Sequence, residues 1–126
     1  MDASLLIVIG RVLLGGLFVI GGVRHFGELG PLTEACRARH VPLPWFSLVA
    51  SSIFQIIAGA MLMIGLLVPW AALGLIIFTL VASFVMVDFW NQEGDRRQGS
   101  INVWLSNLAL IGGLMIAAAQ SAGSAA

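Results

Sequence analysis

The stretch from Trp45 to Val87, WFSLVASSIFQIIAGAMLMIGLLVPWAALGLIIFTLVASFVMV, runs for 43 residues without one Asp, Glu, Lys, Arg or His. A helix needs about 20 apolar residues to cross the ~30 Å hydrocarbon core of a bilayer, so the stretch is long enough for two crossings. It is interrupted at Val68-Pro69-Trp70, and proline is tolerated at a helix start but disfavours helix in the residue before it. The stretch therefore predicts two transmembrane helices, near 45–67 and 70–90, joined by a tight turn.

Two further apolar runs flank this stretch. Only Arg11 is charged between Asp2 and Arg24, and the 29 residues after Arg97 carry no ionisable side chain. These runs predict spans near 4–23 and 101–119. Indole rings prefer the membrane boundary, and the four tryptophans fall at or near the proposed span ends: Trp45, Trp70, Trp90 and Trp104. We therefore predict an all-α fold, a single domain over residues 1–126 that forms an integral membrane bundle of four transmembrane helices.

Composition excludes several other classes of protein. The chain is 60% hydrophobic and 10% charged, whereas soluble domains average roughly 45–50% and about 25%. Lys+Arg and Asp+Glu are both 6, so the basic excess of a nucleic-acid-binding protein is missing. Disorder requires low hydrophobicity, which is also missing. A helical bundle buried in water is the alternative, and the scarcity of charge on four long apolar runs disfavours it.

The arginines predict the topology. The first span has no basic segment before it and carries Arg11 within its apolar run, so we interpret it as a retained helix and not a signal peptide. With four spans, the termini and the 67–69 turn share one side and carry no Lys or Arg, while the other side receives five arginines. These are Arg24, Arg37, Arg39, Arg96 and Arg97. The positive-inside rule then places both termini in the periplasm of a bacterial inner membrane protein.

The connecting segments differ in character. The loop 24–44 is long, and its part Pro31–His40 predicts a short helix lying in the membrane interface. Cys36 within it is interpreted as a small interfacial hydrophobe, with a redox thiol as the alternative. The polar segment 91–100 predicts a compact loop, and the small residues of 120–126 predict a disordered tail.

Arg11 is the most costly residue to place in a bilayer. Its side chain could snorkel to the outer headgroups or face the bundle interior, where nearby glycines would admit another helix. Gln55, deep in the second span, is its predicted partner. The predicted intramembrane polar site comprises Arg11, Ser51, Gln55, Thr79 and Ser83. Simple interhelical hydrogen bonding is the alternative role for these uncharged side chains.

A second polar cluster is predicted at the cytoplasmic ends of the spans. Asp88 there could pair with Arg24 or His25, because all three residues lie at one depth. The cluster comprises Arg24, His25, Asp88, Asn102 and Asn107. Catalytic use of His25 or Asp88 is one interpretation, and a structural polar cluster is the other. Small residues that would let helices pack closely are Gly15, Gly59, Ala109, Gly113 and Ala117.

Several chemistries lack the residues they need. No Cys or His cluster has zinc spacing, so we predict no metal site. A haem held by two histidines needs them on facing spans, but His25 and His40 share one loop. A quinone or an isoprenoid could bind between helices near Arg11 or His25.

The chain resembles the DoxX family of small four-helix membrane proteins. The resemblance rests on IGRVLLGGLFVIGGVRHF (9–26), VPLP (41–44), FQIIAGAMLMIGL (54–66), VDFWN (87–91) and INVWLSNLALIGGLMI (101–116). Arg11 matches the family's arginine in the first span, His25-Phe26 its exit, and Asn107 the asparagine of the last span. Two departures stand out: Gln55 replaces a glutamate that many members carry, and Val87-Asp88 replaces a His-Asn pair.

The resemblance implies an integral subunit or anchor for a membrane-associated redox complex, because the family is named after a subunit of a thiosulfate:quinone oxidoreductase. If the missing Glu or His carries proton chemistry in relatives, this chain lacks it, and we expect no stand-alone catalytic activity. Two other functions stay open. The chain could bind or transport a lipid or isoprenoid, or it could be a purely structural accessory of a larger homo- or hetero-oligomeric membrane complex.

Overall fold

The structure, a computed structural model, describes residues 2–125, and the side chains of residues 2–121. Its elements are α1 (Ala3–Phe26), α2 (Leu29–Ala38), α3 (Pro44–Ile64), α4 (Val68–Met86), the short 3₁₀ helix η1 (Phe89–Asn91) and α5 (Gly94–Ala125). No strand occurs between residues 2 and 125. Four helices are long and apolar enough to cross a membrane. The predicted all-helical, four-span class is therefore confirmed.

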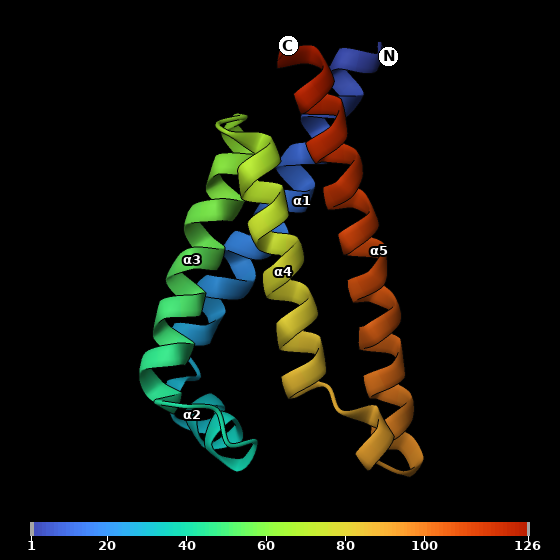
Figure 1. The fold of residues 1–126 in the computed structure, drawn as a ribbon. Coiled ribbons are helices and arrows are strands. Elements are labelled where there is room, and N and C mark those ends of the chain that lie inside the picture. Colours follow the sequence, from blue (N-terminus) through green and yellow to red (C-terminus); the bar gives the residue numbers. More distant parts are fainter. Residues whose placement is uncertain (1, 126) are drawn as a thin grey trace.

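The four long helices form a bundle with two distinct ends (Figure 1). Both chain termini and the α3–α4 turn lie at one end, which we call the terminal end. Helices α2 and η1 lie at the opposite end, which we call the α2 end. Helix α1 packs mainly on α3, and α5 packs mainly on α4. Contacts between α3 and α4 join the two pairs.

Local sequence signals set the helix boundaries. The Asp2 carboxylate accepts a hydrogen bond from the Leu5 N–H at 2.9 Å and caps α1. Pro44 and Pro69 stand in the first turns of α3 and α4, where the missing proline N–H costs no hydrogen bond. Gly65 ends α3 with φ 80°, a left-handed conformation that glycine adopts without strain.

Some predicted boundaries were wrong. Helix α4 ends at Met86, short of the predicted limit at 90, and η1 follows it. Helix α5 begins at Gly94, so most of the predicted loop 91–100 is helical. Asp95 lies in the first turn, where its negative charge stabilises the positive end of the helix dipole. The predicted tail 120–126 is helical through Ala125, since alanine is the strongest helix former. Residue 126 lies outside the described residues.

Close backbone approach fixes the register of α1 against α3. A Cβ added to Gly15 would lie 2.4 Å from the Gly59 carbonyl oxygen, and one added to Gly59 would lie 2.7 Å from the Gly15 oxygen. A Cβ on Gly22 would lie 3.0 Å from the Ser52 oxygen. The glycines therefore allow contact that side chains would prevent. Gly15 faces Gly59, and Gly22 faces Ser52, as antiparallel packing requires.

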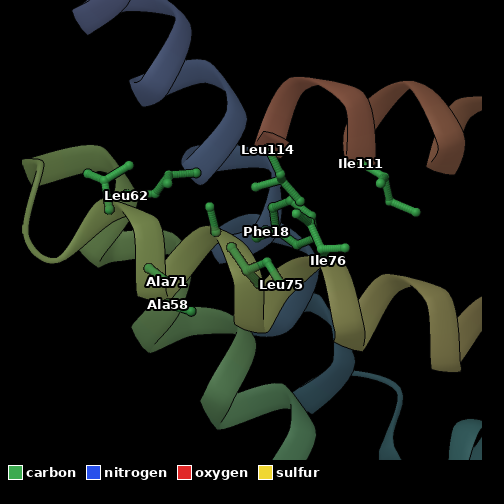
Figure 2. Packing of buried hydrophobic residues seen from close by; sticks show 10 residues of the cluster. Phe18, Ala58, Leu62, Ala71, Leu75, Ile76, Ile111 and Leu114 are labelled. Carbon is green, nitrogen blue, oxygen red and sulfur yellow. The ribbon is translucent and has the colours of Figure 1, made fainter. Parts of the chain in front are cut away.

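The hydrophobic core lies toward the terminal end of the bundle. Phe18, Leu62, Leu75 and Leu114 come from four different helices, and the last three are completely buried. Figure 2 shows these side chains converging with their neighbours on α4. These apolar side chains fill the interior where α1, α3, α4 and α5 meet.

Candidate functional site

A hollow of about 730 Å³ lies in the α2 half of the bundle, and we call it the central cavity. Side chains of α1, α2, α3, α4 and α5 line it, and most of them are apolar. Its polar lining residues from the predicted sites are His25, Ser51, Gln55, Thr79 and Asn107. An apolar cavity of this size with a few polar groups is typical of a small-molecule site.

Gln55 presents an unpaired acceptor in this cavity. Its Nε2 donates to the Phe18 carbonyl oxygen at 3.0 Å, which joins α3 to α1. That oxygen can only accept, so the amide orientation is fixed. Gly21 leaves room for the amide, because a Cβ there would lie 2.8 Å from Nε2. The Oε1 atom is buried without a partner. A bound molecule that donates a hydrogen bond would satisfy it.

Thr79 contributes a second unpaired group. The residue is 5% exposed, and its hydroxyl has no hydrogen-bond partner. One turn further along α4, Ser83 donates to the Thr79 carbonyl oxygen at 2.7 Å and accepts from Asn107 Nδ2 at 2.8 Å. Ser83 and Asn107 thus join α4 to α5, whereas the Thr79 hydroxyl stays available to donate or accept.

His25 is held in one orientation by Ser52. The His25 Nδ1 and Ser52 Oγ atoms lie 2.9 Å apart, and Ser52 donates its only proton to the Leu48 carbonyl oxygen at 2.7 Å. The Nδ1–H must therefore donate to Ser52, which leaves Nε2 as the lone-pair nitrogen of the neutral ring. The cavity lining thus holds two acceptors, Gln55 Oε1 and His25 Nε2, while the buried Arg39 Nε–H is an unpartnered donor.

The ion pair at the mouth of the cavity differs from the predicted one. Asp88 pairs with Arg39 at 3.3 Å, not with Arg24 or His25. Arg39 reaches it because α2 folds back beneath the bundle, whereas Arg24 is exposed at the end of α1. Next to this pair, the Trp104 indole donates to the Val87 carbonyl oxygen at 2.6 Å and fixes the end of α4 to α5.

Arg11 does not meet Gln55, which corrects the predicted pairing. The α1–α3 register places Arg11 opposite Met63, eight residues and roughly 12 Å along the axis from the level of Gln55. Its guanidinium packs on Gly65, where an added Cβ would lie 3.0 Å from Nη2. Within the described residues Arg11 forms no ion pair. The partial negative charge at the C-terminus of α3 is its electrostatic partner.

The remaining predicted residues divide between packing and exposed positions. Gly15 and Gly59 form the α1–α3 contact. Gly113 and Ala117 line a second hollow between α1 and α5. Asn102 and Ala109 are exposed, so the predicted stripe on α5 packs only in part.

Two lining residues were absent from the predicted sites: Cys36 in α2 and Arg39 directly after α2. In the sequence, both fall on one helical face with Leu32. The arginine on this face was the signal that could have identified them as lining residues. Cys36 is 7% exposed. Burial raises the pKa of its thiol, and the nearby Arg39 charge opposes this effect.

Between residues 2 and 125, no group of three or more His, Cys, Asp and Glu side chains could hold a metal ion.

Comparisons with known proteins support a family assignment. Searches of curated proteins and of solved structures found no match. The sequence profile of the DoxX family matches residues 6–88, which is more than half of the chain and holds Arg11, His25, Gln55 and Asp88. The chain belongs to the DoxX family of proteins.

Proposed function

We propose that this chain is a membrane-embedded binding module for a lipid-soluble molecule with a small polar head, the class that includes isoprenoid alcohols and quinones. The observation that carries the proposal is the pair of unpartnered polar atoms, Gln55 Oε1 and the Thr79 hydroxyl, in a mainly apolar cavity. A buried polar atom without a partner costs roughly 1–3 kcal/mol. A ligand that bonds to these atoms recovers this free energy.

The head chemistry follows from these groups. Gln55 Oε1 accepts only, so the head should carry a hydroxyl, while the Thr79 hydroxyl can serve a hydroxyl or a carbonyl. A quinol satisfies both groups, whereas an oxidised quinone has no proton to donate to Gln55 Oε1. We therefore expect a hydroxyl-bearing head to bind more tightly than the matching quinone.

Thr79→Val tests the site without disturbing a known contact. Valine keeps the shape of threonine and removes a hydroxyl that has no protein partner. Binding of a hydroxyl-headed probe in detergent, followed by fluorescence or calorimetry, should weaken roughly three- to tenfold. Thermal stability without ligand should stay level or rise. Asn102→Leu, at an exposed position on α5, is the control and should change neither. Unchanged affinity in Thr79→Val would contradict the proposal.

A role as subunit or anchor of a quinone-linked redox complex is the second candidate. It is favoured by the match between the donor–acceptor pair in the cavity and a quinone–quinol head. Gln55, Thr79 and His25 are the residues that would hold the head, and the quinone would supply the redox chemistry. The partner protein would lie against the apolar outer faces of the bundle.

Purification from the native membrane in mild detergent, followed by mass spectrometry, separates the candidates. A redox subunit should carry a quinone together with a flavin or haem protein. A lipid-binding module should carry one enriched lipid or isoprenoid. A structural accessory should carry only a stoichiometric protein partner. A bare monomer with bulk lipid would exclude the redox-subunit proposal.

A further inference from the structure

A second hollow continues the central cavity toward the terminal end. It has a volume of about 590 Å³ and lies between α1 and α5, and we call it the α1/α5 groove. Leu17 and Leu110 line both hollows. The two hollows therefore adjoin at these leucines.

The groove exists because α1 and α5 pack on different partners. Helix α1 packs on α3 and α5 packs on α4, so contact between α1 and α5 is sparse. Small residues widen the space that remains. A Cβ on Gly10 would meet no atom within 4 Å, and one on Gly113 would come no closer than 3.7 Å to Leu14.

Polarity changes along the combined space. The central cavity holds the unpartnered Gln55 and Thr79 atoms. The groove walls are mainly aliphatic from Leu17 as far as Leu6, which spans roughly 16 Å at the rise of an α-helix, and Arg11 and Gln120 are the polar residues that line its far part. Such a sequence of polar and apolar lining matches a molecule with a compact head and one long tail.

We propose that the α1/α5 groove holds the apolar tail of the molecule whose polar head binds in the central cavity. The ligand is then a long-chain isoprenoid or alkyl compound that lies with its head toward the α2 end and its tail toward Arg11. This assignment rests on the proposed function and adds the direction and length of the ligand.

Tail length alone is a weak test in the wild-type protein, because surrounding lipid chains are as apolar as the groove. Blocking the groove is sharper. Gly113→Leu and Gly10→Leu fill it from its two walls. Gly112→Leu is the matched control, because a Cβ at this position meets no atom within 4 Å and the residue lines neither hollow.

The experiment uses the full chain in nanodiscs and two probes with the same hydroxylated head, one tailless and one with a long isoprenoid tail. Both groove variants should bind the long-tailed probe at least tenfold more weakly and the tailless probe unchanged. A photoreactive group at the tail tip should label Leu6, Ile7 or Ile116, and excess unlabelled probe should suppress this labelling. Gly112→Leu should behave as wild type.

Other results separate the two proposals. If the groove variants weaken both probes equally or neither, the tail assignment is wrong while the head site stands. Labelling confined to outward residues such as Leu105 and Leu108 would also overturn the tail assignment. The same holds if Gly113→Leu releases an ordinary phospholipid and leaves the affinity for both probes unchanged. If wild type binds neither probe, the proposed function itself fails, and the tail assignment fails with it.

Discussion

A single added carbon atom at Gly59 would press on the backbone of α1, because its Cβ would lie 2.7 Å from the Gly15 oxygen. We expect Gly59→Ala to lower the free energy of unfolding by about 1–3 kcal/mol, the usual cost of overpacking. Thermal unfolding in detergent measures the change. Gly112→Ala, which meets no neighbouring atom, is the control and should be neutral or slightly stabilising. Equal stability of both variants would show that α1 and α3 are not in contact at the glycines.

Burial of Cys36 predicts slow thiol chemistry. The thiolate is the reactive form, and burial raises the pKa of this thiol, so less thiolate exists at neutral pH. Maleimide labelling should be at least several-fold slower than for Ala38→Cys in a Cys36→Ala chain, since Ala38 is exposed on the same helix. The rate at Cys36 should continue to rise at a pH where the exposed thiol has levelled off. Equal rates and pH profiles would contradict the burial.

The partners of single residues were the least predictable feature. The predicted membrane depths of Arg11 and Gln55 placed the two residues within reach of each other. The glycine contacts set a different register of α1 on α3, which separates them. Helical periodicity contains no information on this shift, since it depends on which backbone atoms can approach. The amide of Gln55 therefore bonds to Phe18, and its free oxygen emerged only from the structure.

At the scale of elements, α2 packs on α3, and an ion pair directly after α2 links it to the end of α4. Arg39, directly after α2, pairs with Asp88 beyond the end of α4, and their side chains are 21% and 25% exposed. Asp88→Asn should weaken this link only modestly, since water screens a pair that is partly exposed. Hydrogen exchange in residues 29–39 should then be several-fold faster.

The same helix supplies the control for this prediction. Glu34 and Arg37 form an ion pair within α2, with side chains that are 69% and 60% exposed. Glu34→Gln should leave exchange in α2 unchanged, because such pairs contribute little. Equal acceleration in both variants would mean that the Asp88 pair does not hold α2 in place.

Element boundaries were predictable where proline or charge interrupts an apolar run. Helix α3 begins at Pro44 and α4 begins at Val68, next to Pro69. Both starts lie within two residues of the predicted starts of these spans. The start of α5 was missed because the polar residues after Gly94 look like a loop in sequence but form helical turns. The polarity of side chains shows which residues face lipid and which face water. It does not show whether the residues at the end of a span form a helix or a loop.

For the whole molecule, arginine placement predicts the orientation. Five arginines belong to segments at the α2 end, and the terminal end has none outside the spans. We expect Gln98→Cys in a Cys36→Ala chain to resist an impermeant maleimide added to intact cells, whereas Leu66→Cys should react. Both positions are exposed, so access to the reagent decides the result. Labelling of Gln98→Cys alone would reverse the topology.

The arrangement of the core and the cavity has a consequence for how the bilayer acts on this protein. The hydrophobic core lies toward the terminal end and the central cavity toward the α2 end, so the two lie at different depths. Lateral pressure on α3 and α4 from one leaflet therefore meets the buried core, whereas pressure from the other leaflet meets walls with open space behind them. We therefore expect tension or lipid shape in the leaflet at the α2 end to change the volume of the central cavity.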